Sequence, residues 1–359
     1  MENSVESPEK IRTLIVDDAA FMRRALVTIL SKDKEIEIVG VAKHGKDALE
    51  AIEVLDPDVI TLDVDMPVMD GITAIRHIMV RQPRPVIMVS ALAENGRIAL
   101  EALRLGAVDF FPKPSGTIST DIEHQGDEIN TIIKRAAKIN RQAIVRARWK
   151  KPGENKAAAG GSMPEKILLL WAAGGGCTSF IRFLGNVPVS HQACVIVVQD
   201  IRGLALSSFA AELNNHVAWK VVTAEQRTLG GGECLLLAGH NYEIKPGKRN
   251  MEVIAQKAAG KNKGARLIKL SKGHKHEIQF IFLSGRSDDD VKFMKSFVEN
   301  GVSTKILDPK CSVSDWLCDQ AVKEGLGPSL PEVQLWKSAS VFMRSQKRKS
   351  DQAGKKDAF

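Results

Sequence analysis

Residues 59–71, VITLDVDMPVMDG, constrain the fold of this chain more than any other stretch. A run of apolar and β-forming residues ends in the carboxylate of Asp63, and a turn-rich Asp-Met-Pro segment precedes a helical pattern. A charged residue at the carboxyl end of an apolar strand suits the rim of an open parallel sheet, where such folds place their chemistry. The segment therefore predicts a strand-turn-helix unit with Asp63 at a functional edge.

Three further pieces are predicted to reach the same edge. Asp17 and Asp18 follow TLIV, Ser90 follows PVIMV, and Lys113 stands in DFFPKP. Three converging carboxylates repel one another unless a cation lies between them, and hard oxygen ligands suit Mg²⁺. Asp63 could then attack phosphorus as a nucleophile while Lys113 neutralises the developing charge. If the Ser90 hydroxyl moves to donate to the new phosphoryl group, the following helix face changes, which is a switch. Taken singly, Asp18 could cap a helix and Lys113 could be surface charge.

The first part of the chain alternates short apolar runs with amphipathic stretches, which predicts a parallel sheet covered on both faces. The expected strands are 13–17, 37–41, 59–63, 85–90 and 109–112, and the expected helices are 22–30, 46–55, 72–80 and 98–105, with a last helix over about 128–145.

The second part repeats this alternation after a linker, KKPGENKAAAGGSMPEK, rich in small residues. Apolar runs at 167–172, 193–199, 234–238, 277–284 and 304–307 predict strands, and helical patterns occupy 179–184, 205–213, 291–298 and 313–324. We expect a loop over 256–276 and a polar, disordered end past Trp336. The predicted fold class is α/β with two doubly wound parallel-sheet domains, divided as first domain 10–127, helix and flexible basic linker 128–165, second domain 166–330 and disordered basic tail 331–359.

Length and composition limit the possible classes of protein. A chain of 359 residues favours two domains. No apolar stretch approaches the roughly 20 residues needed to span a bilayer, and the polar start of the chain does not read as a secretory signal. Five cysteines without a CxxC pair indicate reduced thiols in a cytoplasmic protein.

The net charge of +8 is concentrated in two segments. Residues 131–156 hold nine Lys/Arg and one Glu, and residues 337–359 hold seven Lys/Arg and two Asp, so the rest of the chain is acidic. The simpler interpretation is solvated, flexible charge in a linker and a tail. Attraction to an acidic partner is the alternative.

Residues 12–115 resemble response-regulator receiver domains. The resemblance rests on VDD ending at Asp18, LDVDMPVMDG around Asp63, MVSA with Ser90 and KP with Lys113. It implies a flavodoxin-like fold and phosphorylation of Asp63 by a histidine kinase (CheA-like). It also implies Mg²⁺ bound by Asp17, Asp18, Asp63 and the backbone carbonyl of Asp65. The implied switch residues are Ser90, Phe110 and Lys113.

The whole chain resembles the chemotaxis protein-glutamate methylesterase (CheB) family, in which a receiver is joined to a doubly wound hydrolase domain. AFMRRAL, LDVDMP and GAVDFFPKP carry the likeness in the first half, and LLLWAAGGG, VVQDI, LLLAGHNYEI and FLSGRSDDD follow in the family's order in the second.

The catalytic residues that this resemblance implies are largely replaced. The family's serine nucleophile lies in a Gly-Ala-Ser-Thr-Gly-Gly elbow and matches Ala173, whose methyl group cannot attack an ester. The family's general-base histidine matches Asp200, and its aspartate matches Asp289, which has no histidine to orient. Glu243 stands where the family has a further histidine, and the segment beginning Pro-Ser-Val-Asp that helps to build the substrate cleft is not found. No catalytic residue is expected at Ala173, Asp200 and Asp289.

Displaced chemistry is the alternative for the second domain. Cys177 or Ser179 could act as a nucleophile with a base from His191, His216 or His240, but core or surface roles are simpler because nucleophile and base must lie within about 3 Å. Residues 174–176 at a helix start could bind an anion. Residues 272–276 contain two histidines that could bind a metal, but a solvated loop is the simpler interpretation. Residues 288–290 are expected to cap a helix.

Three functions are compatible with these patterns. The first is a phosphorylation-controlled adaptor or phosphate sink that contacts a chemoreceptor, a kinase or another signalling protein. In the second, the chain is an active methylesterase or glutamine deamidase with displaced residues. A regulator that binds nucleic acid through basic segments is the third, but no helix-turn-helix spacing supports sequence-specific recognition.

Overall fold

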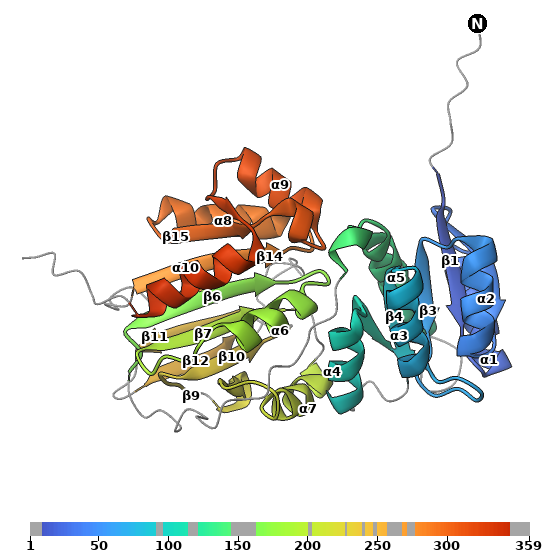
Figure 1. Ribbon diagram of the computed structural model, residues 1–359, viewed down its shortest axis with the longest axis horizontal. Helices are drawn as coiled ribbons and strands as arrows, with labels where there is room; N and C mark the ends of the chain where they lie inside the picture. The colour runs from blue at the N-terminus through green and yellow to red at the C-terminus, as the bar shows by residue number, and fades with distance from the viewer. Residues whose placement is uncertain are drawn as a thin grey trace, which may run out of the picture.

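A computed structural model of the chain describes residues 9–90, 96–113, 121–144, 163–199, 203–226, 228–238, 241–246, 250–256, 268–270 and 277–344. Two parallel sheets with helices packed on their faces account for most of these residues (Figure 1). This arrangement confirms the predicted fold class, an α/β protein with two doubly wound sheets.

The first sheet has five parallel strands in the order β2-β1-β3-β4-β5, which is the flavodoxin-like order. Its middle strands β3 and β4 are buried along their whole length, because helices cover both faces of a parallel sheet. All five predicted strands are present within two residues of their expected ends. Their bounds are β1 (Ile11–Val16), β2 (Ile36–Ala42), β3 (Val59–Leu62), β4 (Val86–Ser90) and β5 (Asp109–Pro112).

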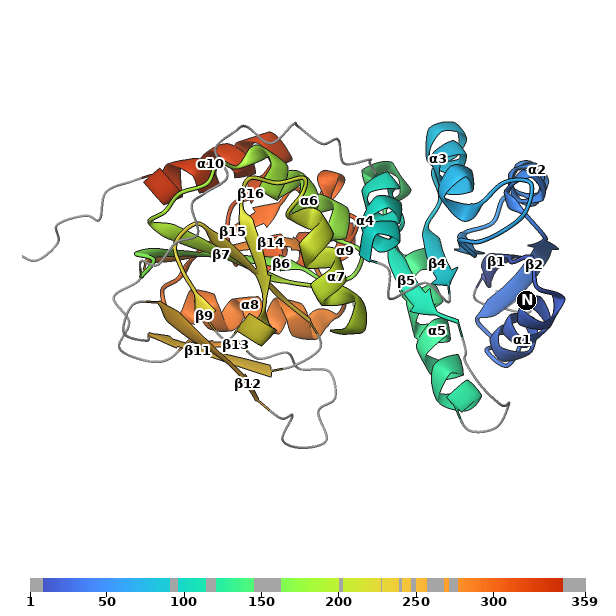
Figure 2. The ribbon, with the colours of Figure 1, turned by 90° about the horizontal axis from the view of Figure 1, so that it is seen from below.

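Five helices accompany this sheet. Helices α1 and α5 contact each other, while α2 contacts α3 and α3 contacts α4 (Figure 2). Their bounds are α1 (Ala20–Leu30), α2 (Gly45–Leu55), α3 (Gly71–Arg81), α4 (Gly96–Leu105) and α5 (Asp121–Ala137).

The position of α5 corrects the sequence analysis. The helix expected over 128–145 begins at Asp121 and ends at Ala137, and a short 3-10 helix follows at Arg141–Ala143. The predicted boundary between residues 127 and 128 therefore falls inside a helix that contacts β3, β4 and β5. The polar first two turns of α5 concealed its start, since only its second half carries a regular apolar stripe.

The second sheet has seven strands in the order β16-β15-β14-β6-β7-β10-β8, with parallel neighbours throughout. The strands are β6 (Lys166–Ala172), β7 (Ala193–Val198), β8 (Lys220–Thr223), β10 (Glu233–Leu237), β14 (Glu277–Ser284), β15 (Ser303–Leu307) and β16 (Ser329–Leu330). The helices are α6 (Cys177–Asn186), α7 (Gly203–Leu213), α8 (Asp288–Glu299), α9 (Asp315–Lys323) and α10 (Glu332–Arg344).

Several elements of the second half were not predicted, including β8 and β16 of the main sheet and β13 within the loop expected over 256–276. A four-stranded sheet in the order β13-β11-β12-β9 contains antiparallel pairs, with β9 (Thr228–Leu229), β11 (Asn241–Pro246), β12 (Met251–Gln256) and β13 (Ile268–Leu270). Residues 332–344, expected to be disordered, form α10, whose residues Leu335, Ala339, Phe342 and Met343 are buried. The buried Lys166 donates a hydrogen bond to the carbonyl of Phe342 at 2.6 Å and so satisfies an end of α10. The tail beyond 344 lies outside the described residues.

Helix α4 of the first sheet packs against α7 and α6 of the second, and both views place these helices side by side (Figures 1 and 2). Buried apolar residues from the two halves belong to one continuous cluster. Within the described ranges, no helix combines the length and the apolar character that crossing a membrane requires.

Candidate functional site

The predicted acidic residues meet at the carboxyl edge of the first sheet. Asp17 follows β1, Asp63 follows β3 and Lys113 follows β5, so three strand ends bring them together. The carboxylates of Asp17 and Asp63 are buried, while Asp18 is exposed. Oxygen atoms of the three aspartates lie within 4.8 Å of one another.

Lys113 joins the two buried carboxylates. Its Nζ lies 2.7 Å from Asp63 Oδ2 and 2.8 Å from Asp17 Oδ2. Asp63 Oδ1 accepts the backbone N–H of Val64 at 2.7 Å. The ammonium group therefore offsets part of the repulsion between the carboxylates.

Burial and charge act in opposite directions on these groups. Burial raises the pKa of Asp63 above its ordinary value, and the hydrogen bond from Lys113 only partly reverses that effect. Burial works to lower the pKa of Lys113, but the interactions with Asp17 and Asp63 outweigh it and the pKa is raised. A cation that entered the pocket would favour ionised carboxylates and work against the raised pKa of Asp63.

The turn after β3 fixes Asp63 by a close backbone approach. A Cβ on Gly71 would lie 2.0 Å from the carbonyl oxygen of Asp63, so only glycine fits at the start of α3. The N–H of Gly71 donates to the carbonyl of Val64 at 2.8 Å, and Asp70 caps α3 by accepting the N–H of Thr73 at 2.7 Å. The Asp-Gly pair in the sequence motif thus has a local structural cause.

The other predicted residues of this pocket lie on neighbouring elements. Ser90 is the buried last residue of β4, and its carbonyl accepts the N–H of Lys113 at 3.2 Å. Phe110 is half-buried in β5, and Asp65 is exposed in the loop after β3. The roles of Ser90, Phe110 and the Asp65 carbonyl remain predictions.

The donor set fits a hard divalent cation. Asp17 Oδ2 is buried and makes no hydrogen bond of regular geometry, although the Lys113 ammonium lies beside it. An oxygen in this position can bind a metal without breaking a hydrogen bond, and carboxylate oxygens are ligands that Mg²⁺ takes together with waters and phosphate oxygens. Asp17, Asp18 and Asp63 are therefore the residues that could hold it.

The second candidate site is the turn after β6, where Ala173 is buried. Its carbonyl accepts the hydroxyl of Ser284 at 2.6 Å. A Cβ on Gly174, which has φ +59°, would lie 2.1 Å from the carbonyl oxygen of Gly285, and a Cβ on Gly176 would lie 1.8 Å from Ser284 Oγ. Packing against the end of β14 thus explains these two glycines without an anion.

Two adjacent aspartates at the start of α8 have different surroundings. Asp289 is 65% exposed and its carboxylate lies 3.0 Å from the ammonium of Lys292. Asp290 is buried, and its Oδ2 accepts the backbone N–H groups of Arg286 and Ser287. Ser287 and Asp290 form a capping box, so the expectation that residues 288–290 cap a helix is confirmed for Asp290, while Asp288 and Asp289 lie in the first turn of α8. Asp200 lies outside the described residues.

The alternative nucleophiles have no described histidine beside them. Cys177 begins α6 at the carboxyl end of β6, and burial raises its pKa well above the usual thiol value. His191 lies just before β7 and His216 just before β8, at the amino ends of the parallel strands. A strand of this length spans about 20 Å, which is too far for proton transfer from Cys177 or the buried Ser179. His240 and residues 272–276 lie outside the described ranges.

Comparisons with known proteins agree with a chain of two domains. A response regulator receiver domain family matches residues 13–120, and a CheB methylesterase family matches residues 168–335. A protein-glutamate methylesterase/protein-glutamine glutaminase of Carboxydothermus hydrogenoformans is 38% identical over 237 residues, covering 64% of this chain and 67% of its own. One from Hydrogenovibrio crunogenus is 33% identical over 367 residues, covering 88% and 94%. The solved response regulator domain of Thermotoga maritima CheB is 45% identical and covers 37% of this chain and 99% of its own, with a TM-score of 0.35.

Proposed function

Because this chain belongs to the CheB family, with a response-regulator receiver domain and a CheB methylesterase domain, we propose that it is phosphorylated on Asp63 and that its second domain does not hydrolyse esters. One contrast carries the proposal. In the acidic pocket the carboxylates of Asp17 and Asp63 each lie within 2.8 Å of the Lys113 ammonium, while the turn after β6 carries the methyl group of Ala173.

The phosphoryl donor that fits this pocket is a phosphohistidine of a CheA-like histidine kinase. A carboxylate oxygen of Asp63 forms the new O–P bond, the N–P bond breaks, and the departing imidazole keeps the electron pair and takes a proton. The Lys113 ammonium stabilises the added negative charge. Asp17, Asp18, Asp63 and the carbonyl of Asp65 would hold Mg²⁺, which would supply positive charge to the phosphoryl oxygens.

Ser90 is the group through which the phosphoryl state reaches the rest of the fold. Its hydroxyl would donate to the phosphoryl group, and Phe110 in the next strand would follow that movement. Ser90 ends the strand that leads to α4, so a change in its side chain bears directly on that helix. The second domain then acts as an adaptor whose partner is a chemoreceptor, a kinase or another signalling protein, or the whole chain serves as a phosphate sink.

Loss of hydrolysis follows from the chemistry of the replaced positions. Alanine offers no nucleophile, and Asp289 pairs with Lys292 at the surface. A second function as an active esterase with displaced residues is not favoured, because the described histidines 191 and 216 lie at the far edge of the sheet. The basic segments give no independent support to specific nucleic-acid binding.

Labelling with a radioactive acyl phosphate tests the first half of the proposal. We expect label on the wild-type chain with Mg²⁺ and none on Asp63→Ala. Label on the variant, or none on either chain, would contradict it. Methanol release from methylated receptors tests the second half, and turnover that survives Asp63→Glu but disappears with Cys177→Ala would identify a displaced active site.

A further inference from the structure

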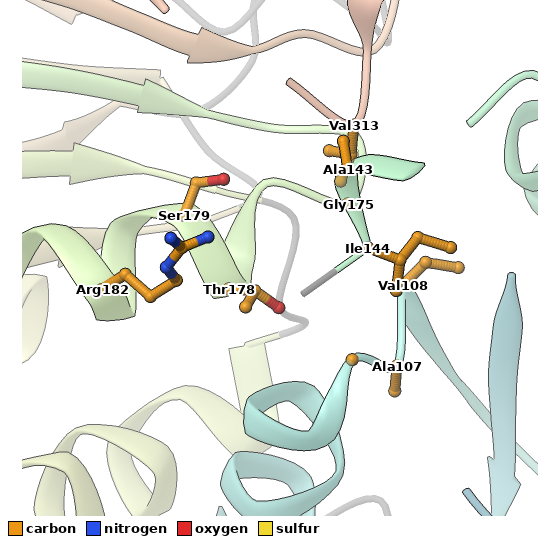
Figure 3. A pocket seen from close by; sticks show the side chains of 10 residues that line it. Ala107, Val108, Ala143, Ile144, Gly175, Thr178, Ser179, Arg182 and Val313 are labelled. Atoms are coloured by element: carbon orange, nitrogen blue, oxygen red, sulfur yellow. The ribbon is translucent and has the colours of Figure 1, made fainter. Parts of the chain in front are cut away.

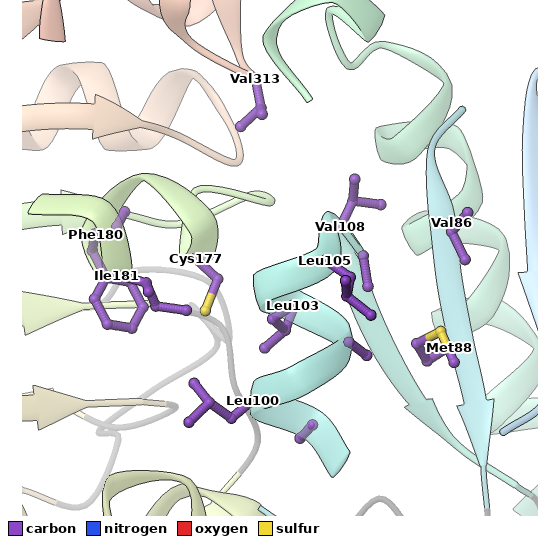
Figure 4. Packing of buried hydrophobic residues seen from close by; sticks show 14 of the residues in the cluster. Val86, Met88, Leu100, Leu103, Leu105, Val108, Cys177, Phe180, Ile181 and Val313 are labelled. Atoms are coloured by element: carbon purple, nitrogen blue, oxygen red, sulfur yellow. The ribbon is translucent and has the colours of Figure 1, made fainter. Parts of the chain in front are cut away.

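The boundary between the two domains is closely packed where the structure describes it. The N–H of Gly96 donates to Ser208 Oγ at 2.8 Å, and the side chains of Leu100 and Leu103 point toward Cys177 (Figure 4). A cavity lined by residues of both domains has a volume of about 10 Å³, enough for one water molecule (Figure 3). A cavity of this size takes no substrate or effector, so it is not a second binding site.

The acidic pocket, in contrast, is supported by a residue that has no role so far. The backbone N–H of Asp17 donates to the carbonyl of Ala42 at 3.2 Å, and its Oδ1 accepts the N–H of Ala19 at 2.8 Å. The backbone carbonyl of Asp17 accepts a hydrogen bond from Nη1 of Arg23 at 2.7 Å. These bonds fix the residue and leave its Oδ2, beside Lys113, as the oxygen that faces the pocket.

The carbonyl that Arg23 holds belongs to the peptide between Asp17 and Asp18. A peptide unit is planar, so a hydrogen bond to its oxygen fixes the orientation of the chain on both sides of it. The turn has little other support from side chains, because the N-cap of α1, Ala19, makes no side-chain hydrogen bond. Arg23, half-buried in α1, therefore reaches back to the one peptide that carries two of the three carboxylates.

The charge of Arg23 does not explain its place. A guanidinium group repels a divalent cation and also offsets the repulsion among the carboxylates of an empty pocket, and such effects extend over roughly 10 Å at ordinary ionic strength. Both effects weaken the binding of a cation. The hydrogen bond acts in the opposite direction, because it holds the carboxylates in place before the ion arrives.

We propose that Arg23 is a positioning residue for the cation site and acts through the peptide between Asp17 and Asp18. It touches no reacting atom, and its contribution is to keep both carboxylates aimed at one point. This role rests on the proposed function, in which Asp17, Asp18 and Asp63 hold Mg²⁺. Groups that orient the ligands of a metal in this way typically change its affinity about 10–100-fold when they are removed.

Three variants of the full chain separate geometry from charge. Arg23→Met removes the donor and the charge, and methionine forms helices about as well as arginine does. Arg24→Met removes the same charge at the next position, which is exposed, and is the matched control. Arg23→Lys keeps the charge and can donate one hydrogen bond to the same carbonyl.

Isothermal titration with MgCl₂ at fixed ionic strength then measures the Kd of each protein. We expect the Kd of Arg23→Met to rise about tenfold above that of wild type, and that of Arg23→Lys to lie between them. The Kd of Arg24→Met should stay the same or fall slightly. A Kd for Arg23→Met equal to that of wild type, or lower, would overturn the positioning role, and a lower value would show that only its charge matters.

Urea unfolding without Mg²⁺ identifies a bond that serves only the fold. If Arg23→Met unfolds at lower urea but binds Mg²⁺ as wild type does, Arg23 supports α1 and not the site. Circular dichroism checks that each variant is folded. If Arg23→Met is not, Arg23→Lys decides, with a Kd above that of wild type as the supporting result and an equal Kd as the contrary one.

Labelling by acyl phosphate separates this inference from the proposed function. At saturating Mg²⁺, Arg23→Met should reach the wild-type extent of labelling, because Arg23 touches neither Asp63 nor the phosphoryl group. If the Kd shifts as expected but wild type takes no label, phosphorylation fails and the positioning role stands. If wild type takes label but the Kd of Arg23→Met is unchanged, the positioning role fails alone. A wild type that binds no Mg²⁺ would overturn the positioning role whatever its labelling.

Discussion

Asp63 and Ala173 occupy equivalent places in the two sheets, but the side chains around them differ in kind. Each follows an interior parallel strand, β3 or β6, and each precedes a helix that begins after a tight turn. Around Asp63 the ends of β1 and β5 supply two carboxylates and an ammonium group. Around Ala173 the end of β14 and the start of α9 supply hydroxyls, of Ser284 and Ser314, that donate to backbone carbonyls. The comparison shows that a sheet edge keeps its geometry whether or not it keeps reactive groups.

The largest expected difference between the two edges is in phosphoryl uptake. Asp63→Asn removes the attacking oxygen and should abolish labelling by acyl phosphate. Asp289→Asn, at the equivalent edge of the second sheet, should leave labelling unchanged. The Asp289 carboxylate is exposed and forms an ion pair with the exposed Lys292, away from the acidic pocket. Equal loss in the two variants would show that the edges are coupled in a way that their contacts do not explain.

Removal of a lysine should also separate the two regions. Lys113→Met leaves the buried carboxylates of Asp17 and Asp63 without their cationic partner, and we expect the free energy of unfolding to fall by about 3–5 kcal/mol. Urea unfolding with and without Mg²⁺ measures this, and the ion should restore part of the loss. Lys292→Met is the control and should change nothing measurable. A stable Lys113→Met without Mg²⁺ would mean that the carboxylates take up protons instead.

The turns at the two edges should be equally intolerant of a methyl group. A Cβ on Gly71 lies 2.0 Å from Asp63 O, and one on Gly174 lies 2.1 Å from Gly285 O. We expect Gly71→Ala and Gly174→Ala each to lower the free energy of unfolding by about 1–3 kcal/mol. Gly185→Ala should not destabilise the fold, and thermal unfolding compares the three. A neutral Gly174→Ala would indicate that the second edge has relaxed together with its chemistry.

The raised pKa of Asp63 gives a smaller, pH-dependent effect. Its pKa in the folded protein lies above the ordinary value of 3.8, so the folded state binds the extra proton between these two values. The free energy of unfolding should therefore fall as pH rises from 3.8 through the raised pKa, and stay level above it. Urea unfolding of wild type against Asp63→Asn without Mg²⁺ isolates this contribution, which should be absent from the variant. If the stability of wild type relative to Asp63→Asn rose with pH instead, the pKa of Asp63 would be lowered and not raised by folding.

The smallest expected effect is that of restoring a serine. Ala173→Ser supplies a hydroxyl but no base, if Asp200 stands at the family's histidine position as the sequence resemblance implies. Methanol release from methylated receptors should stay at background. Turnover by this single variant would show that a base is present nearby.

The first edge was predictable because every group at it ends a strand. Apolar runs set the strands, parallel packing sets the edge, and Asp17, Asp63 and Lys113 then meet without further information. The ends of α5 and the existence of α10 were missed for local reasons. The start of α5 is polar, and the apolar stripe through Leu335, Ala339 and Phe342 lies beside a basic tail that drew the prediction toward disorder.

The contact between the domains could not be derived from the sequence. Residues 96 and 208 are far apart in the chain, and nothing local to Gly96 names Ser208 as its partner. The one available signal was the breadth of the apolar surface of α4. Short strands such as β9 and β13 were missed because two or three residues carry no periodicity.

Asp290 has a consequence for any attempt to bring hydrolysis back. Its carboxylate already occupies the N–H groups of Arg286 and Ser287, in the turn whose Gly285 carbonyl touches Gly174. The N–H groups of Arg286 and Ser287 are therefore not available to an oxyanion that forms on this side of the sheet edge. If the proposed loss of hydrolysis holds, a nucleophile and a base introduced near position 173 would not be enough, because those two donors would also have to be freed from the carboxylate of Asp290.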